Sequence, residues 1–273
     1  MSVLPTRQAV SAIARRDLTV VARSKAVMLP IVILPVVFFV VMPAVLTFAV
    51  FAGGDQLREI VPLLERLPPQ VRDQLGGGTV EQQVLVFLIE FQFASLFHII
   101  PLMVAAVIAA DSFAGEKERR TLEALLYTPT TDRQLYLAKL AGPWAAAVTV
   151  TAGGFVMYAL TANLLAAGAV GRLLVITPMW LVNLGLVSPA VAALALGALV
   201  IVSARVRTFQ DAYQLGALIV LPLVLLVAAQ FAGVLFLDLP VVIVLGVVVW
   251  LVAGAVLWLG YRSFRRERLL LAT

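Results

Sequence analysis

Cysteine is absent from the 273 residues of this chain and histidine occurs only once, so several kinds of chemistry are ruled out from the start. Disulfides, thiol nucleophiles and thiolate metal ligands all require cysteine. A zinc site needs three or four side-chain ligands, mostly histidine and cysteine, and one histidine does not supply them. No metal site is therefore expected.

Two further features are missing or scarce. Neither GxxxxGKS nor GxxxxGKT occurs, so the chain has no phosphate-binding loop of that type, and any energy must come from an ion gradient or another polypeptide. Only 13% of the residues are charged, whereas 62% are hydrophobic. Soluble domains contain about half apolar and about a quarter charged residues. The composition therefore predicts an all-α integral membrane protein with several spans.

The long apolar runs give the number of spans. A helix needs ~20 mostly apolar residues to cross a bilayer. The sequence contains six such runs, at 26–51, 84–110, 137–166, 173–202, 212–233 and 240–261. We predict an N-terminal segment, 1–25, and one six-span domain, 26–273. Within this domain we expect an external segment at 52–83, cytoplasmic loops at 111–136 and 203–211, and a cytoplasmic tail at 262–273.

Lysine and arginine are unevenly distributed around these runs. Sixteen lie in the N-terminal segment, the 111–139 region, the 203–211 segment and the C-terminal tail, and four lie on the opposite side. Because loops rich in these residues stay in the cytoplasm, both termini are predicted to be cytoplasmic. The net charge of +5 follows from this bias, so no nucleic-acid partner is expected.

The segments at the two membrane surfaces have helical patterns. In 1–25 a basic polar face lies opposite an apolar one, which is typical of a helix lying in the headgroup plane. The alternative is an extension of the first span. In 52–83 apolar residues recur at helical spacing, broken by Pro62 and Pro68. We expect short amphipathic helices there, which either gate an exit or cover loop ends.

Residues 111–136 combine high charge with good helix formers. The helical pattern runs from Glu116 to Tyr127, with leucines on one side, and Pro129 follows its end. Such a helix can dock in a groove of a soluble partner and transmit motion to the spans. The alternative is an ordinary solvated loop. Two capping boxes are also predicted at helix starts, formed by Thr79 with Gln82 and by Thr131 with Gln134.

The family resemblance rests on the string at 111–129, DSFAGEKERRTLEALLYTP, with its continuation to Leu135 and Lys139-Leu140. It resembles the cytoplasmic motif of ABC-2-type ABC transporter permeases, approximately GEKE-R-(G/R)-TLE-LL-x-(S/T)-P followed by a polar turn, leucines and GK. The match covers about thirty contiguous residues, and Ala138 stands where many relatives have glycine. The segment 203–212, SARVRTFQDA, is similar to the second cytoplasmic segment of such permeases.

This resemblance implies the non-catalytic transmembrane subunit of an ATP-driven ABC exporter, with the fold of ABC-2 or type V exporters. Two copies, or this chain and a related permease, would form a homo- or heterodimer in a prokaryotic plasma membrane. The chain itself would bind no cofactor. It would contact membrane lipid. ATP and Mg²⁺ would be bound by a separate ABC ATPase subunit.

The resemblance also makes the helix at 116–127 the coupling helix. The residues expected to make charged contacts with the ATPase, or to hold the N-terminal elbow, are Glu116, Glu118, Arg119 and Glu123. The expected apolar anchors are Leu122, Leu125 and Leu126, and the expected secondary contacts are Arg205 and Arg207.

Polar side chains inside the second span are candidates for a substrate pathway. Glu90, Ser95 and His98 lie on or near one stripe of that helix. Ionisable residues within a membrane usually face the protein interior or water. They could therefore line a pathway or relay protons or cations. Alternatively, His98 bonds a neighbouring helix and Glu90 lies near the outer interface.

Two other functions remain open on the sequence alone. One is an ATPase-coupled mechanotransmission scaffold, although the external segment is short for that role. The other is an ion-coupled secondary transporter, for which inverted repeats would be expected. The scarcity of charge in the spans favours a small or amphipathic substrate, while drugs, lipids, peptides, glycans and sodium all stay open.

Overall fold

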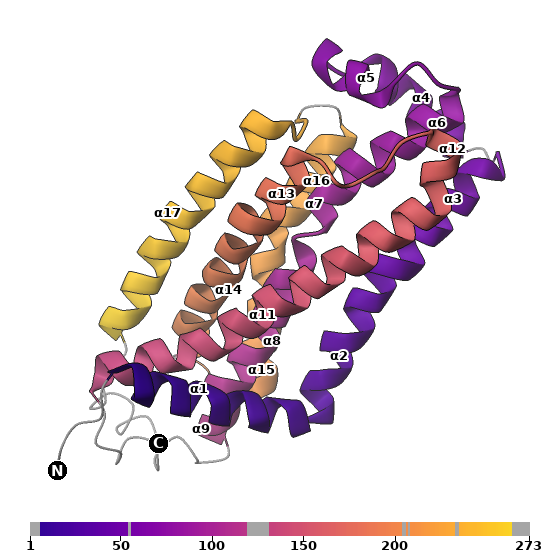
Figure 1. The fold of residues 1–273 in the computed structure, drawn as a ribbon. Helices are drawn as coiled ribbons and strands as arrows, with labels where there is room; N and C mark the ends of the chain where they lie inside the picture. The colour runs from indigo at the N-terminus through magenta and orange to yellow at the C-terminus, as the bar shows by residue number, and fades with distance from the viewer. Residues whose placement is uncertain are drawn as a thin grey trace.

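Six long apolar helices run side by side through the molecule (Figure 1). The computed structural model describes residues 6–53, 56–118, 131–203, 206, 208–232 and 235–263. The helices long and apolar enough to cross a membrane are Val27–Phe51, Val80–Gly115, Asp132–Val170, Pro178–Ser203, Gln210–Gln230 and Leu239–Arg262, numbered here as spans 1 to 6. The prediction of an all-α fold with six spans is confirmed.

Most spans are built from several helical segments. Span 1 consists of α2 (Lys25–Val36), η1 (Val37–Val41) and α3 (Met42–Phe51). Span 2 consists of α6 (Val80–Val86), η2 (Phe87–Gln92), α7 (Phe93–Leu96), α8 (Ile99–Ala110) and η3 (Asp111–Gly115), and α9 (Glu116–Glu118) follows it. Span 3 consists of α11 (Asp132–Ala162), η4 (Asn163–Ala167) and α12 (Gly168–Val170).

The remaining spans are built in the same way. Span 4 consists of α13 (Pro178–Val182), η5 (Asn183–Val187) and α14 (Ser188–Ser203). Span 5 consists of α15 (Phe209–Ala217), the 3₁₀ segment η6 (Leu218–Val220) and α16 (Leu221–Phe231). Span 6 is α17 (Leu239–Ser263). In the described residues, η1 to η5 are π-helical turns, which are often found at functional sites.

The predicted helix starts are confirmed at two positions. Thr79 Oγ1 accepts from the Gln82 amide at 3.4 Å, and the Gln82 side chain accepts from the Thr79 amide at 2.8 Å. Thr131 and Gln134 form the same capping box, at 3.2 and 3.0 Å. Each box satisfies two backbone donors that a helix N-terminus would otherwise leave free.

Span 4 begins later than its apolar run predicts. The run starts at residue 173, but the helix starts at Pro178, after the N-cap Thr177. Gly171, with φ of 77°, ends α12 in the left-handed region, and the chain then continues without helix until Thr177. Proline suits the first helical turn because its missing N–H is not needed there.

Span 2 forms the centre of the bundle. About 83% of its most apolar stretch is buried, against 12% for span 5 and 17% for span 6. An aromatic cluster packs around it, with the rings of Phe93 and Tyr158 stacked at 4.5 Å and those of Phe97 and Trp180 meeting edge-on at 5.3 Å. These contacts join spans 2, 3 and 4. The other spans therefore keep more of their apolar surface for lipid.

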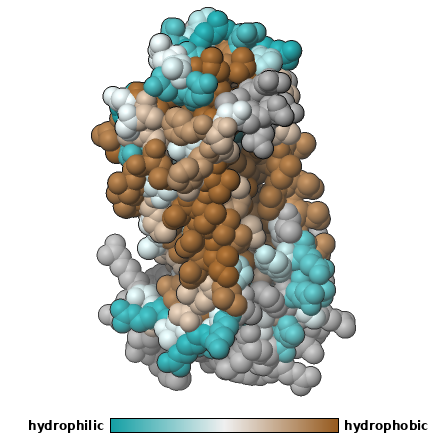
Figure 2. Space-filling model, turned by 90° about the vertical axis from the view of Figure 1, so that its right-hand side faces the viewer, coloured by the Kyte–Doolittle hydropathy of each residue, from teal (hydrophilic) through white to brown (hydrophobic). Residues whose placement is uncertain are grey.

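Helices outside the spans cover both ends of the bundle. Helix α1 (Thr6–Arg23) lies across the end at which span 3 begins (Figure 1), where Gly142 approaches the backbone of Ala14. Helices α4 (Gln56–Glu65) and α5 (Pro69–Leu75) lie at the opposite end. On the face drawn in Figure 2, a hydrophobic belt separates polar surfaces at the two ends.

Candidate functional site

The predicted coupling residues fall mostly outside the part of the chain that the structure describes. Glu116 and Glu118 are described, in α9, and Glu118 is exposed. The predictions for Arg119, Leu122, Glu123, Leu125, Leu126, Arg205 and Arg207 lie outside the described residues.

Glu116 is held in a buried ionic contact at the end of span 2. Its side chain is 7% exposed, and Lys139, which is completely buried in α11, donates from Nζ to Glu116 Oε2 at 2.5 Å. The same Nζ donates to the Ser112 carbonyl at 3.1 Å. Arg16 of α1 approaches from the other side, with Nη1 3.7 Å from Glu116 Oε1. Glu116 thus joins spans 2 and 3 and the helix across their ends.

In the sequence, Lys139 counted as a positive charge and as part of the string that resembles the ABC-2 motif, but not as a partner in a buried ionic contact. A lysine is rarely fully buried unless it is paired. The signal was available, since Lys139 lies at the start of a long apolar run. Its partner, 23 residues earlier in the chain, could not be identified without the packing of α11 against span 2.

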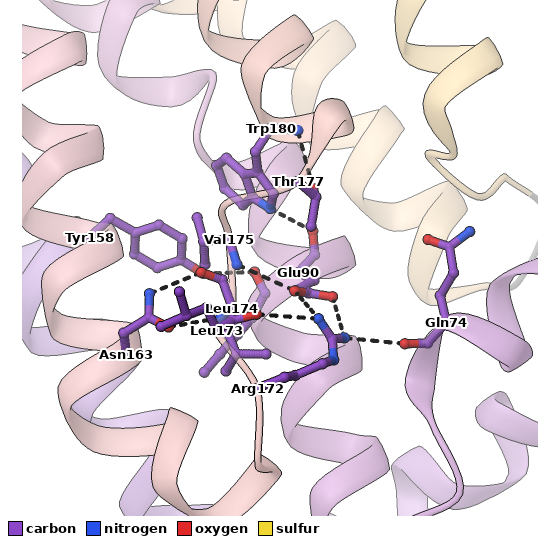
Figure 3. Close-up of polar contacts among 11 residues, drawn as sticks. Gln74, Glu90, Tyr158, Asn163, Arg172, Leu173, Leu174, Val175, Thr177 and Trp180 are labelled. Atoms are coloured by element: carbon purple, nitrogen blue, oxygen red, sulfur yellow. Dashed lines mark hydrogen bonds and ion pairs between the residues drawn. The ribbon is translucent and has the colours of Figure 1, made fainter.

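Glu90 lies at the other end of span 2 in a second buried ionic contact (Figure 3). Arg172 donates to both carboxylate oxygens, from Nη1 to Oε1 at 2.9 Å and from Nη2 to Oε2 at 2.8 Å. The backbone amide of Val175 donates to Oε1 at 3.3 Å. Bidentate arginine–carboxylate pairs are among the strongest hydrogen-bonded contacts in proteins. The carboxylate is therefore well satisfied within the chain.

The loop that carries Arg172 is fixed at several points. Asn163 bonds both backbone groups of Leu174, accepting from its amide at 2.7 Å and donating to its carbonyl at 2.9 Å. Val175 has φ of 70°, which is uncommon for a β-branched residue. Arg172 Nη2 also donates to the carbonyl of Gln74, at the end of α5, at 3.1 Å. Through Arg172, Glu90 therefore anchors both this loop and α5.

Two ring donors bond the π-turn that contains Glu90. Tyr158 Oη donates to the Ile89 carbonyl at 2.7 Å, and Trp180 Nε1 donates to the Glu90 carbonyl at 3.1 Å. Figure 3 shows both rings converging on this turn from spans 3 and 4. A π-turn disturbs the regular backbone ladder, and these side chains supply partners for its carbonyl groups.

Ser95 and His98 form a separate group further along span 2. His98 Nδ1 lies 3.3 Å from the Ser95 carbonyl, and the ring is almost completely buried. A carbonyl only accepts, so Nδ1 carries the proton and Nε2 of the neutral ring is left as an acceptor. Among the described residues, His98 Nε2 and Ser95 Oγ make no hydrogen bond of good geometry, and the side chain of Asn183 in η5 lies close to His98.

His98 borders a cavity of ≈ 360 Å³ between spans 2, 4, 5 and 6. Every other lining residue is apolar: Leu102, Val187, Val191, Leu194, Ile219, Pro222, Leu223, Leu226, Leu245, Val249 and Val252. Ligand cavities are typically apolar and contain a few polar groups that fix orientation. His98 thus forms part of the cavity wall, and Ser95, which does not line the cavity, contacts His98 through its backbone carbonyl. Glu90, about 12 Å away along the helix axis, has other partners.

Comparison with known protein families gives a match that covers most of the chain. A family model described as ABC-2 family transporter protein matches residues 11–240 of this chain. The matched region runs from α1 to the beginning of span 6 and includes the charged segment after span 2. No curated protein matches the chain.

Proposed function

The chain belongs to the ABC-2 family of transporter proteins and is a permease subunit of an ABC transporter, and we propose that it couples ATP hydrolysis on a separate ATPase subunit to export of a small amphipathic substrate. Membership of this family implies an ABC ATPase partner, and the six apolar helices make the chain a multi-pass membrane protein.

The observation that carries the coupling proposal is the buried Lys139–Glu116 pair. Glu116 opens the charged segment that resembles the coupling helix of the family, and Lys139 lies in the first turns of span 3. A displacement of that segment by the ATPase would pull on span 3 and, through Arg16, on α1. Direct contact between Glu116, Glu118 or the residues after them and the ATPase is part of the proposal.

The substrate proposal rests on the cavity beside His98. An aliphatic wall suits an apolar body, while the acceptor Nε2 suits one hydrogen-bond donor such as a hydroxyl or an amine. Glu90, in contrast, is engaged by Arg172, which favours a structural role for it over ion binding. We therefore place Ser95 and His98, rather than Glu90, beside the pathway.

The assembly and orientation are proposed on the same basis. A second copy of the chain, or a related permease, completes the transporter in a prokaryotic plasma membrane. Both termini lie in the cytoplasm, as the excess of Lys and Arg in the segments on their side indicates.

Copurification tests the coupling proposal. The tagged permease would be coexpressed with the ABC ATPase encoded beside it, and ATP hydrolysis measured in lipid. We expect the double substitution Arg119→Glu, Leu125→Asp to abolish copurification, whereas Arg66→Glu at the opposite membrane surface leaves it unchanged. Undiminished copurification of the double variant would overturn the coupling role. If no ATPase associates with the unaltered chain, the ion-coupled secondary transporter becomes the better interpretation.

Substitution of His98 tests the pathway. We expect His98→Ala to lower the transport of a fluorescent amphipathic amine and a fluorescent fatty alcohol by the assembled complex, with normal ATPase assembly. Gln214→Ala is the matched control, because Gln214 is an exposed polar residue of span 5. Equal transport by the His98 variant and the control would remove His98 from the pathway.

A further inference from the structure

A small pocket lies between the beginning of span 3 and the end of span 6, away from the contacts described above. It encloses ≈ 190 Å³ and is lined by Arg133, Tyr136, Leu137, Leu257, Trp258 and Tyr261. Its lining residues belong to the first turns of α11 and the last turns of α17, at the end of the bundle where α1 lies (Figure 1). None of these residues takes part in the ionic contacts of Glu116 or Glu90.

One arginine in the lining and a second beside it give this pocket a positive charge. Arg133 is exposed in the first turn of α11, and Arg262 lies in the last turn of α17. The guanidinium of Arg262 lies 3.7 Å from the ring centre of Trp258, which holds it beside the pocket. Neither arginine has a carboxylate partner within the part of the chain that the structure describes. Both arginines are exposed, so an external anion can reach them.

Three aromatic rings also line the pocket, and contacts between residues fix their positions. Tyr136 Oη donates to the Leu257 carbonyl at 2.7 Å, which connects spans 3 and 6. The rings of Tyr136 and Tyr261 lie 5.5 Å apart. Trp258 and Tyr261 are exposed at the end of a span whose preceding surface is aliphatic. Tryptophan and tyrosine in such a position mark the headgroup level of a membrane.

We infer that this pocket binds the headgroup phosphate of an anionic phospholipid. Arg133 and Arg262 pair with the phosphate, and the acyl chains run along the exposed aliphatic surface of span 6. Basic pockets between transmembrane helices on the cytoplasmic side are suited to such headgroups. The inference rests on the proposed membrane orientation but does not depend on the ATPase or on the exported substrate.

The lining favours a lipid over free phosphate or a nucleotide. Of the three non-aromatic lining residues, two are leucines, Leu137 and Leu257, and the third, Arg133, is the one charged residue in the lining itself. A soluble polyanion would need more donors than two arginines offer, because it must give up its hydration on all sides. A lipid phosphate keeps its outer side in water, and its chains gain contacts with the apolar surface.

Lipid binding can be measured on the permease alone. The full chain would be titrated with phosphatidylglycerol and with phosphatidylcholine and analysed by native mass spectrometry. The variants are Arg133→Gln, Arg262→Gln and their combination, and Arg66→Gln serves as a control at the other membrane surface. A repeat with millimolar inorganic phosphate separates the lipid from free phosphate. Thermal unfolding of each variant reports whether the fold is retained.

We expect selective retention of phosphatidylglycerol, weakened about fivefold by each single substitution and more by the pair, since one basic residue near an anionic membrane contributes about a factor of five. The Arg66→Gln control should bind like the unaltered chain. Equal binding of the two lipids, or unchanged binding by a folded double variant, would overturn the inference. Complete displacement by inorganic phosphate would also overturn it, because the site would then not be specific for lipid.

Discussion

Glu90 and Glu116 lie towards opposite ends of span 2 and are both buried, yet they are paired differently. Glu90 receives two hydrogen bonds from Arg172, whose side chain is 39% exposed, and one from a backbone amide. Glu116 receives a hydrogen bond from Lys139, which has no exposed surface, and lies near Arg16 of α1. One pair is partly open to water and the other is closed off from it.

The first contact fixes a loop, whereas the second connects the elements that we propose to move together during ATP coupling. The Glu90 contact joins a short loop and α5 to the centre of the bundle. The Glu116 contact instead connects three elements, two of which flank the segment proposed to meet the ATPase. A buried pair does not by itself add net stability, but the loss of one partner is costly. The Glu116 pair should therefore resist separation, so that the elements it joins move together.

Removing Lys139 should give the largest effect. Lys139→Met leaves Glu116 buried without its closest cationic partner, and breaking a buried pair costs about 3–5 kcal/mol. We expect the free energy of unfolding in detergent to fall by that amount. Lys25→Met, at an exposed position, should stay within about 0.5 kcal/mol of the unaltered chain.

The double substitution Lys139→Met, Glu116→Leu makes the comparison sharper. Replacing both members of a buried pair by apolar residues is often nearly neutral. Much of the lost stability should therefore return, while copurification with the ATPase stays impaired. If the double variant is no more stable than Lys139→Met, the cost does not come from an uncompensated charge.

Glu90→Gln should have a smaller effect. The amide still accepts one hydrogen bond from Arg172 and the charge that remains is partly exposed to water, so we expect a loss of about 2 kcal/mol. Unfolding in detergent measures it, with the exposed Asp73→Asn as control. A loss as large as that of Lys139→Met would contradict the distinction between the open and the closed pair.

Arg172→Lys should have the smallest effect of the three single substitutions in these ionic contacts. The charge is kept, but the two-pronged contact with Glu90 and the bond to Gln74 cannot both be made by one ammonium group. We expect about 1 kcal/mol of destabilisation and faster hydrogen exchange in α5. Unchanged exchange in α5 would show that Arg172 does not hold the external helix.

The sequence predicted the parts of this fold that depend on local pattern. The six spans follow from length and hydrophobicity, and the boxes at Thr79 and Thr131 follow from side chains that bond their own helix turn. The two ionic contacts were not predicted. Their partners are 82 and 23 residues apart, and only the packing of span 2 against its neighbours brings them together.

The late start of span 4 shows a second limit of the sequence. The segment from Leu173 to Ile176 is as apolar as the spanning helices. Its buried backbone is not helical, because the amides of Leu174 and Val175 donate to the side chains of Asn163 and Glu90 instead of to a helical ladder. Hydropathy cannot distinguish a buried loop from a helix when both exclude water. The function of His98 was likewise left open, because its cavity is formed by four spans.

The π-turns bear on how the length of this chain can vary. A π-turn closes its hydrogen bond over one residue more than an α-turn. Deleting one residue from 183–187, the π-turn of span 4, would leave a continuous α-helix whose later residues still face the same neighbours. A deletion within α14 would instead rotate the rest of the helix by about 100°. Homologous chains whose spans differ in length by a single residue should therefore differ at such turns. In a scan of single-residue deletions along span 4, we expect deletions within 183–187 to be tolerated best.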